Sequence, residues 1–363
     1  MESDTPASFS KSLSPLICQW FVANQRNLPW RENYDPYEVM VSEFMAQQTV
    51  MKTVVPYFIR WMEAFPNIQH LAKAHEETAL KLWEGLGYYS RCRNLLRTAK
   101  IICDEFNGQI PHDPKILESL PGIGPYTASA IASIAYGEKI PVVDGNVKRV
   151  VSRLFEWGER MDSKKTEAYI KNVCGHMLQV ADARTLNQGL MELGSICHAG
   201  NPKCDMCPLS DDCGAKRNNT IHQYPVKKVR EKSIRLNFEY QLIISPKQVV
   251  LAKIEGEFWW EGMWIFPFYS DSYPDKTPQL DIDKILTTLI NSTSNLPVVE
   301  KFDHAITKYR ITATAKAALV SKSFQLPSQF QWVDLNKLNS LPMPKASANW
   351  RRYLLEKYTE LKK

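Results

Sequence analysis

LPGIGPYTASAIASIAYGEKIPVVDGN, residues 120–146, is the stretch that decides the fold of this chain. It begins with a tight glycine hairpin and continues directly into an alanine-rich helix. Gly122 and Gly124 allow the backbone to approach another group closely, and the N–H groups at the start of the next helix attract an anion. Pro125 suits the first helical turn, where its missing N–H costs nothing. The pattern favours a helix-hairpin-helix that holds a DNA phosphate without reading base sequence. A plain helical corner with a glycine turn is the alternative.

The same stretch ends in Val142-Val143-Asp144-Gly145-Asn146, where a further helix opens. Asp144 is either an N-cap or a carboxylate placed for chemistry. Glu43 lies in an earlier helix that begins at Asp35-Pro36, and its simplest interpretation is a solvated helical acid. The hairpin, the acids and a cysteine cluster further along occur together in one order. This combination favours a catalytic role for both acids.

Composition predicts a globular protein of two domains. The sequence has 363 residues, 44% of them hydrophobic and 23% charged, so it is able to bury a sizeable core. A net charge of +6 is a weak indication of a polyanionic partner. The first residues do not resemble a secretory signal, and the longest uncharged window, 119–137, is broken by prolines and glycines, so no membrane span is expected. We expect a cytoplasmic protein in a reducing compartment, where cysteines act as ligands or buried thiols.

Hydrophobic spacing of three and four residues predicts an all-α first half, up to about residue 215. Alternation with a period of two begins only after residue 230 and predicts an α+β second half. The expected helices are one within 10–30 that ends before Leu28, one that carries Glu43, one from after Thr49 to about Phe65, and 68–85, 90–106, 145–155, 164–180, 184–196, 280–291 and 346–359. The expected strands are 234–245, 248–254, 263–269 and 309–320.

A polar and basic run separates the two halves and is interpreted as a linker. The expected organisation is a catalytic all-α domain over residues 1–217, a linker over 218–232 and a smaller domain over 233–363. A cysteine-rich module at about 190–215 completes the first domain.

Four of the eight cysteines form a regular cluster. Cys197, Cys204, Cys207 and Cys213 have the spacing C-x6-C-x2-C-x5-C. Four thiolates in so short a span suit a [4Fe–4S] cluster or a tetrahedral zinc ion, and spacing alone does not separate the two. Four unrelated buried thiols are the third possibility. The other four cysteines lie singly in helical patterns and are interpreted as core residues.

Together these motifs resemble the helix-hairpin-helix DNA glycosylases that carry an iron–sulfur cluster, and within them the adenine DNA glycosylases of the MutY type. The resemblance covers most of residues 15–213 and is specific as a set. It implies an all-α glycosylase domain, a [4Fe–4S] cluster rather than zinc, and a Nudix-like second domain. The shared stretches are LPWRENYDPYEVMVSEFMAQQT (28–49), LWEGLGYYSRCRNL (82–95), LPGIGPYTASAI (120–131), PVVDGNVKRV (141–150) and NQGLMELG (187–194).

The resemblance implies that four residues carry the chemistry. Glu43 would be the general acid that protonates the departing adenine, a role that requires a raised pKa. Asp144 would stay ionised and stabilise the oxocarbenium-like sugar, as a charge or as a transient nucleophile. Tyr126 and Asn146 would position the acids and the water. Relatives that also cut the strand have a lysine where this chain has Tyr126, so a monofunctional glycosylase is expected.

Base flipping and base recognition are implied for further residues. Gln48 and Tyr88 match the family's residues that push into the base stack; a core aromatic is the other interpretation of Tyr88. Family contacts to the flipped base map onto Leu28, Trp30, Arg31 and Gln188. Apart from the resemblance, the first two of these would be core residues and Arg31 a surface cation.

In the family, the second domain reads 8-oxoguanine opposite the adenine. Residues 260–267, WEGMWIFP, resemble its W-x-F-P turn, and no Nudix hydrolase box is present, so phosphohydrolysis is not expected. The family's reading loop, H-x-F-S-H, corresponds here to the stretch from His304 to Lys308. Thr307 keeps a hydroxyl for the lesion, whereas Ile306 replaces an aromatic ring and Lys308 replaces a histidine. The two replacements leave open how sharply 8-oxoguanine is preferred over guanine.

The expected substrate is double-stranded DNA with adenine opposite 8-oxoguanine or guanine, bound by a monomer that is associated with the nucleoid. The expected reaction is hydrolytic removal of the adenine to leave an abasic site. A thymine or uracil mismatch glycosylase on the same scaffold is one alternative. A non-catalytic DNA-damage-binding protein is another, and the presence of Glu43, Tyr126 and Asp144 argues against it.

Overall fold

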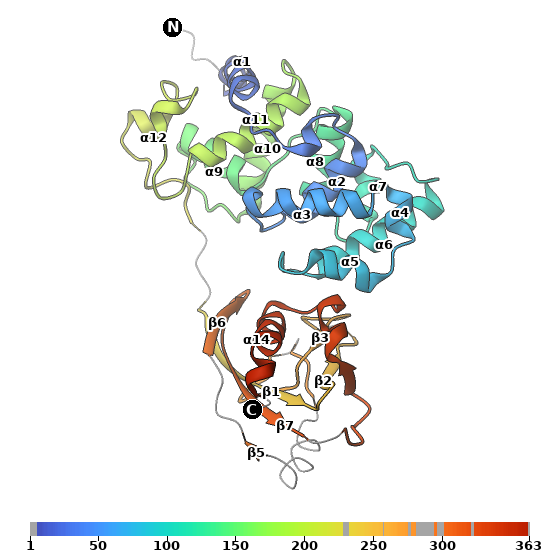
Figure 1. Ribbon diagram of the computed structural model, residues 1–363. Coiled ribbons are helices and arrows are strands. Elements are labelled where there is room, and N and C mark those ends of the chain that lie inside the picture. The colour runs from blue at the N-terminus through green and yellow to red at the C-terminus, as the bar shows by residue number, and fades with distance from the viewer. Residues whose placement is uncertain are drawn as a thin grey trace. The chain divides into compact units, whose positions relative to one another are not determined.

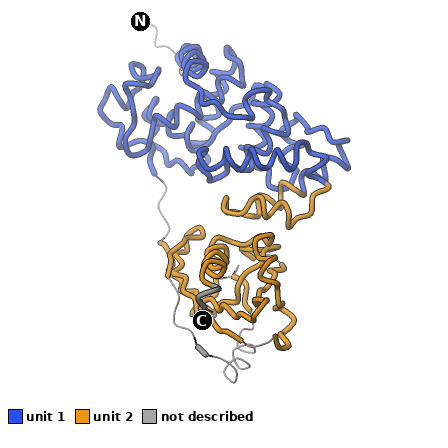
Figure 2. Tube along the Cα trace, in the orientation of Figure 1, with its two compact units in different colours: residues 1–72, 97–230 blue, residues 73–96, 231–363 orange. Residues whose placement is uncertain are grey.

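A computed structural model describes residues 6–227, 232–256, 258–274, 277–280, 294–295, 301–320 and 323–361. The chain divides into two compact units, which Figure 2 shows in two colours. Unit 1 comprises residues 1–72 and 97–230, and unit 2 comprises residues 73–96 and 231–363. The change from unit 1 to unit 2 after residue 230 lies within the stretch 218–232 that was interpreted as a linker, and residues 73–96 group with the C-terminal half.

Unit 1 is helical (Figure 1). In the part of the chain that the structure describes, no strand precedes Ile234, so the all-α prediction for the first half is confirmed. Its elements are α1 (Pro6–Asn24), η1 (Pro29–Arg31), α2 (Pro36–Ala46), α3 (Met51–Ala64), α4 (Ile68–Ala72), most of α6 (Ser90–Glu105), α7 (Pro114–Ser119), α8 (Pro125–Tyr136), α9 (Gly145–Leu154), α10 (Lys164–Leu178), α11 (Ala183–Ile196), η2 (Cys204–Met206) and α12 (Gly214–Arg217).

The first helix ends at Asn24, before Leu28 as predicted, and Leu28 has extended backbone angles because the proline that follows disfavours the helical conformation. One helix prediction needs correction. The continuous helix predicted over 68–85 is broken into α4 and α5 (Glu76–Trp83), with His75 extended between them.

The core of unit 1 fixes the helices that carry the predicted site. One cluster of buried side chains joins α1, α9, α10 and α11. In it, Gly189 of α11 packs so closely on α1 that a Cβ there would lie 2.8 Å from Cγ2 of Ile17. A second cluster joins α2 and α8 through Val39, Ala130 and Ile134. Because of this second cluster, the helix that carries Glu43 lies against the helix that follows the glycine hairpin.

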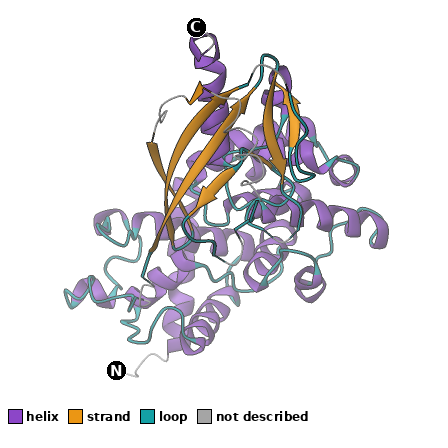
Figure 3. Cartoon of the chain, turned by 90° about the horizontal axis from the view of Figure 1, so that it is seen from below, coloured by secondary structure: helices purple, strands orange, loops and turns teal. Residues whose placement is uncertain are grey.

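Unit 2 contains α5, the first residues of α6 and a mixed sheet. Figure 3 shows the strands of this sheet in orange. The strand order is β3-β2-β1-β7-β5, with β4 paired to β1, β6 to β7 and β8 to β2. Strands β1 and β7 pair in parallel over their whole length, and the other pairs are antiparallel. The elements are β1 (Ile234–Ile244), β2 (Gln248–Lys253), β3 (Trp264–Ile265), β4 (Phe268–Ser270), β5 (Ser294–Asn295), β6 (Lys301–Ile306), β7 (Tyr309–Leu319), β8 (Gln331–Asp334), η3 (Leu335–Ser340) and α14 (Lys345–Leu361).

The α+β prediction for the second half is confirmed, with differences in detail. The strand predicted over 263–269 is two short strands, since Pro267 lies between them and has no N–H to donate to a sheet. Strands β6 and β8 were not predicted from the sequence. The helix predicted over 280–291 lies outside the described residues, except for residue 280. Trp350 of α14 is buried against Tyr240 of β1, which attaches this helix to the sheet.

None of the described helices has the length and apolar character needed to cross a membrane.

Candidate active site and iron–sulfur centre

The glycine hairpin joins α7 and α8, as the helix-hairpin-helix prediction requires. Gly122 has φ +77°, a left-handed conformation that favours glycine, and Ile123 N–H closes the turn on the Leu120 carbonyl. Gly124 is the N-cap of α8, and no side chain of the described residues caps the first turn there. A Cβ on Gly124 would meet nothing within 4 Å, so the space in front of the helix start is open. This is the geometry of an anion site at a helix N-terminus.

Interactions with α11 hold the chain between α8 and Asp144. The buried Asn187 side chain accepts from Val142 N–H and donates to the Ser133 hydroxyl and to the Ile140 carbonyl. Arg184, one turn earlier, donates to two carbonyls in the last turn of α8. The segment that leads to Asp144 is therefore fixed by hydrogen bonds to side chains that lie about 45 residues further along the chain.

Asp144 is the N-cap of α9 and also the centre of a polar network. Its Oδ1 accepts from Val147 N–H at 2.7 Å, and its Oδ2 accepts from the Asn146 amide at 2.8 Å. Burial raises the pKa of Asp144, while these hydrogen bonds and the nearby Arg149 oppose the rise. The capping interpretation and the chemical interpretation are thus compatible, since one oxygen caps the helix and the other belongs to the polar network.

Arg149 orients Asn146 from the opposite side and was not singled out from the sequence. Its Nη2 donates to Asn146 Oδ1 at 2.6 Å and to the Gly194 carbonyl at 2.8 Å, and its Nε donates to the Cys197 carbonyl at 2.7 Å. A Cβ on Gly194 would lie within 2.8 Å of Asn146 Cα, so this position requires glycine. The arginine links the Asp144–Asn146 pair directly to the backbone of the cysteine cluster.

Glu43 is buried and faces the hairpin helix. The residue is 7% exposed, and the Tyr126 hydroxyl donates a hydrogen bond to its carboxyl group. Burial raises the pKa of Glu43 to about 7, and the Tyr126 hydrogen bond opposes part of that rise. Asp144 is near enough to raise the pKa of Glu43 further by charge repulsion. The structure therefore brings Glu43, Tyr126 and Asp144 together and excludes the interpretation of Glu43 as a solvated helical acid.

A second polar network lies beside this acid. Arg31 donates from Nε to Gln188 Oε1 and from Nη1 to Glu192 Oε1, both at 2.8 Å. Gln188 in turn donates to the Tyr34 hydroxyl at 3.2 Å. Glu192, only 3% exposed, also binds Arg26 through both carboxylate oxygens. Arg31 is thus a largely buried, paired cation, and the charge of Arg31 acts to lower the pKa of Glu43.

Leu28 and Trp30 are buried, and Trp30 packs edge-on against Phe58 at 4.9 Å between ring centroids. Both are core residues in this structure, which is compatible with a role as walls of a base pocket. The two residues assigned to the base stack have a different character. Gln48 and Tyr88 are exposed and have left-handed backbone angles, φ +57° and +49°. Tyr88 is 42% exposed, so the core interpretation of this ring is wrong.

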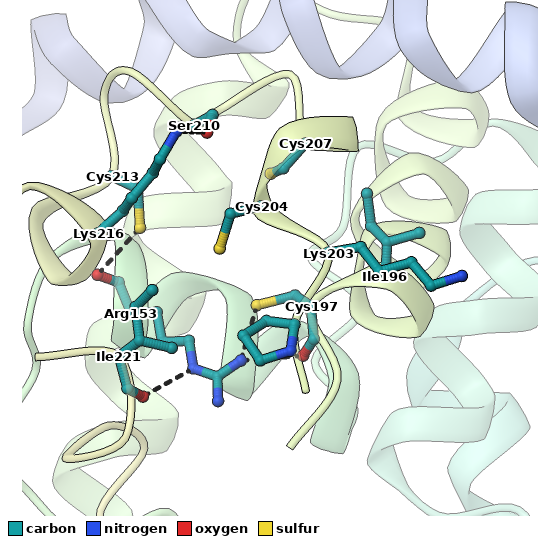
Figure 4. Close-up of a pocket in the computed structure, with 11 residues that line it drawn as sticks. Arg153, Ile196, Cys197, Lys203, Cys204, Cys207, Ser210, Cys213, Lys216 and Ile221 are labelled. Carbon is teal, nitrogen blue, oxygen red and sulfur yellow. Dashed lines mark hydrogen bonds between the residues drawn. The ribbon is translucent and has the colours of Figure 1, made fainter. Parts of the chain in front are cut away.

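The four cysteines of the cluster line one pocket (Figure 4). They come from the end of α11, from η2 and the loop after it, and from the start of α12. Figure 4 shows their sulfur atoms turned toward a common space. Four thiols around one space are the ligand set of a polynuclear cluster that thiolates hold at its corners.

The electrostatics of the pocket fit a bound iron–sulfur cluster. Burial raises the pKa of Cys207 to about 11 and also raises the pKa of Cys213, so their thiolates require a neighbouring positive charge such as metal supplies. Arg153, 3% exposed, donates from Nη1 to the Cys197 sulfur at 3.2 Å and from Nε to the Tyr224 carbonyl at 3.0 Å. A buried cation that hydrogen-bonds a ligand sulfur stabilises the negative charge of a thiolate-bound cluster.

In unit 2, the loop that resembles a lesion reader is a β-hairpin. Strands β6 and β7 pair from Ile306 and Tyr309 outward, which leaves Thr307 and Lys308 as the two turn residues. Thr307 has φ +49°, and Ile306 is half-buried. Burial lowers the pKa of His304 to about 4, and among the described residues neither of its ring nitrogens has a hydrogen-bond partner. The hairpin exposes the two turn residues, Thr307 and Lys308.

Three side chains of unit 1 that contact predicted site residues were missed in the sequence, namely Arg149, Arg153 and Glu192. Each is a charged residue in a helix, and its helical spacing carries no signal that separates it from a solvated residue. Only their burial and their hydrogen-bond partners, which lie 44 to 166 residues away in the sequence, distinguish them from solvated charged residues.

Comparisons with known proteins agree with this geometry. Residues 41–176 match the HhH-GPD superfamily of base excision DNA repair proteins, and residues 197–213 match the iron-sulfur binding domain of endonuclease III. The second match contains all four cysteines of the pocket, which is the site of a [4Fe–4S] cluster.

Two curated relatives illustrate the range of similarity. The adenine DNA glycosylase of Buchnera aphidicola subsp. Schizaphis graminum is 32% identical over 347 residues, covering 92% of this chain and 95% of that protein. The adenine DNA glycosylase of Mus musculus is 40% identical over 209 residues, covering 55% of this chain and 41% of that protein. A solved structure of a thermostable thymine-DNA glycosylase is similar in fold, with a TM-score of 0.53 and 24% identity, covering 58% of this chain and 97% of that chain. The helix-hairpin-helix, the paired acids, the cysteine pocket and the length of the match together place this chain in the adenine DNA glycosylase family.

Proposed function

We propose that this protein removes adenine from a mispair with 8-oxoguanine or guanine in double-stranded DNA and leaves an abasic site. One observation carries the proposal: a buried carboxyl, Glu43, has a pKa of about 7 and receives a hydrogen bond from Tyr126 beside the capping carboxyl of Asp144. An acid with a pKa near neutrality is able to donate a proton at physiological pH. Adenine is a poor leaving group and needs such a proton.

The other carboxylate acts on the sugar. As the N-glycosidic bond breaks, positive charge develops on the deoxyribose, and an ionised Asp144 stabilises it. Two hydrogen bonds, from Val147 N–H and from the Asn146 amide, favour the ionised form of Asp144. Water then adds to the sugar carbon, either directly or after a transient ester with Asp144. Since Tyr126 stands where strand-cutting relatives have a lysine, the reaction ends at the abasic site.

Glu43 and Asp144 have separate tasks because their environments differ. Burial dominates at Glu43, where one carboxylate oxygen has no hydrogen-bond partner among the described residues. Asp144 has partners on both oxygens. Pairs of acids whose surroundings separate their pKa values are a common arrangement for one proton donor and one charge stabiliser.

DNA binding in this proposal uses the open helix start at Gly124 for a phosphate, and Gln48 and Tyr88 to enter the base stack. Leu28, Trp30, Arg31 and Gln188 form the pocket for the flipped adenine. The left-handed backbone at Gln48 and Tyr88 supports this assignment, because it projects two exposed side chains from tight turns. The protein acts as a monomer in this proposal.

We further propose that residues 233–363 form a Nudix-like domain that reads the base opposite the adenine. In this proposal the domain contacts 8-oxoguanine through the β6–β7 turn, where Thr307 and Lys308 are exposed. Ile306 is the last residue of β6 before the turn. The Thr307 hydroxyl is a donor and acceptor for the lesion, and Lys308 adds a cation next to the DNA backbone.

The test is a single-turnover assay on duplexes that carry adenine, thymine or uracil opposite guanine or 8-oxoguanine. We expect excision of adenine alone, with strand breaks only after alkali. Glu43→Gln and Asp144→Asn should bind the adenine duplexes and cleave them negligibly. Excision of thymine or uracil instead would assign the scaffold to another glycosylase, and near-normal turnover by either variant would remove that residue from the mechanism.

A further inference from the structure

Glu84 is the central residue of an ion-pair cluster within unit 2. It lies at the end of α5, where its carboxylate receives hydrogen bonds from both terminal nitrogens of Arg351, from Lys81 Nζ at 3.0 Å and from the backbone N–H of Met343 at 3.0 Å. The side chains of Glu84 and Arg351 are 15% and 12% exposed. Hydrogen bonds from Arg351 and its charge hold the pKa of Glu84 below its ordinary value, against the effect of burial. The cluster joins α5 to α14 and to the segment before it.

The turn that presents Tyr88 begins directly after Glu84. Gly85 and Gly87 have φ +103° and +74°, and Tyr88 itself has φ +49°. Trp83 Nε1 donates to the Gly87 carbonyl at 3.1 Å, and Arg91 Nη2 donates to the same carbonyl at 3.0 Å. The Arg91 guanidinium also lies 5.5 Å from the centre of the Tyr88 ring. Hydrogen bonds from Trp83 and Arg91 thus hold the turn that presents the exposed Tyr88 ring, and Glu84 is the residue that directly precedes the turn.

The other end of the cluster reaches the β6–β7 hairpin. Trp350, the neighbour of Arg351 in α14, packs on Phe302 of β6 with 4.8 Å between ring centroids. Strand β6 continues from Phe302 to the turn at Thr307 and Lys308. The Trp350–Phe302 contact and the largely buried Glu84–Arg351 ion pair thus form a continuous connection from β6 to the Tyr88 turn.

We propose that Glu84 is a positioning residue that couples lesion contact at the β6–β7 turn to the action of Tyr88 on the base stack. The inference rests on the proposed function. When the hairpin is engaged by 8-oxoguanine, α14 is held in one position, and the Glu84–Arg351 pair holds the Tyr88 turn with it. Lesion contact then favours the flipped state of the adenine. When guanine is opposite the adenine, the hairpin makes fewer contacts with that base, and the coupling stabilises the flipped state of the adenine less.

The experiment compares Glu84→Gln with Glu77→Gln in the full-length protein with its cluster. Glu77 is a matched control, because it also joins α5 to the sheet, through Lys253 at 2.8 Å and Trp264 Nε1 at 3.0 Å, yet lies away from the Tyr88 turn. In Glu84→Gln, the new side chain would still accept from Met343 N–H but would present an amide N–H₂ to Arg351. Two quantities are measured, the single-turnover excision rate and the fluorescence of 2-aminopurine placed at the adenine position, which reports unstacking without cleavage.

We expect Glu84→Gln to lower the excision rate opposite 8-oxoguanine by about tenfold, the effect of one charge-assisted hydrogen bond, and to lower the rate opposite guanine by less. The 2-aminopurine signal should fall in parallel, and Glu77→Gln should keep the wild-type ratio of the two rates. Arg351→Met should reproduce the effect, and the double variant should add little to it. Should Glu84→Gln fail to fold, Arg351→Lys, which keeps the charge and loses the paired geometry, should give a smaller shift of the same ratio.

An unchanged ratio in Glu84→Gln and Arg351→Met, or an equal change in Glu77→Gln, would overturn the inference. These outcomes differ from failure of the proposed function, in which the wild-type protein itself would leave adenine in place in both duplexes.

Discussion

Glu43→Gln should stabilise the protein at alkaline pH while it abolishes excision. In the wild-type protein the buried carboxyl must ionise as the pH rises, and ionisation is disfavoured at that site. A glutamine has nearly the same shape, is neutral at every pH, and is able to accept the Tyr126 hydrogen bond through its carbonyl oxygen. The substitution therefore removes the charge with little change in packing.

The difference between the folded and unfolded pKa values of Glu43 sets the size of the expected change in unfolding free energy. A carboxyl with a pKa of 4.5 in the unfolded chain and about 7 in the folded protein corresponds to about 3 kcal/mol. Because the folded pKa is the higher one, the folded state binds more protons between pH 4.5 and pH 7. The stability of the wild-type protein should therefore decrease through that window and level off above it. The stability of Glu43→Gln should not show this decrease between pH 4.5 and pH 7.

The assay is urea unfolding of wild-type protein and Glu43→Gln at pH 5 and at pH 8, followed by circular dichroism. The free-energy difference between variant and wild type should be larger at pH 8 than at pH 5 by about 2.5 kcal/mol, in favour of the variant, because part of the full effect is already present at pH 5. Asp182→Asn is the control, because hydrogen bonds from Thr185 hold the pKa of Asp182, the N-cap of α11, below its ordinary value against the effect of burial. The free-energy difference between that variant and wild type should not change in the variant's favour between pH 5 and pH 8. A difference that does not change between the two pH values would refute the claim that Glu43 is buried with a raised pKa.

Four further predictions address single interactions. In Tyr126→Phe, Glu43 loses the hydrogen bond that lowers its pKa, so the alkaline fall of the single-turnover pH–rate profile should move up by about one pH unit; a profile that stays near pH 7 would contradict this contact. Arg149→Met should slow excision by about tenfold with unchanged iron content, since Asn146 loses a donor; full activity would make Arg149 dispensable. Arg153→Lys should release iron to a chelator faster than wild type, and equal rates would show that the Cys197 contact does not protect the cluster. Thr307→Ala should reduce the preference for 8-oxoguanine over guanine, and an unchanged ratio of rates would count against the β6–β7 turn as the reader.

Local patterns were sufficient for much of the fold and for part of the site. The helix-hairpin-helix could be predicted because Gly122 needs a left-handed backbone and Pro125 suits a first helical turn, and both requirements act within a few residues. The cysteine pocket could be predicted because all four ligands lie within 17 residues, 197–213. The change from helices to strands after residue 230 followed from the period of the hydrophobic pattern.

Tertiary structure alone decided the protonation and the partners of the acids. Glu43 has a raised pKa because α2 packs on α8, and the spacing of apolar residues in α2 does not show which face that contact covers. Arg149, Arg153 and Glu84 became functional candidates only when the fold brought them to partners 48, 44 and 267 residues away. The physical reason is that burial and ion pairing depend on contacts distant in sequence, whereas caps, turns and ligand spacing depend on neighbours. The stretch 120–146 thus determined that an open helix start at Gly124 and a capping aspartate at Asp144 would lie on successive helices, and packing brought Asp144 near Glu43.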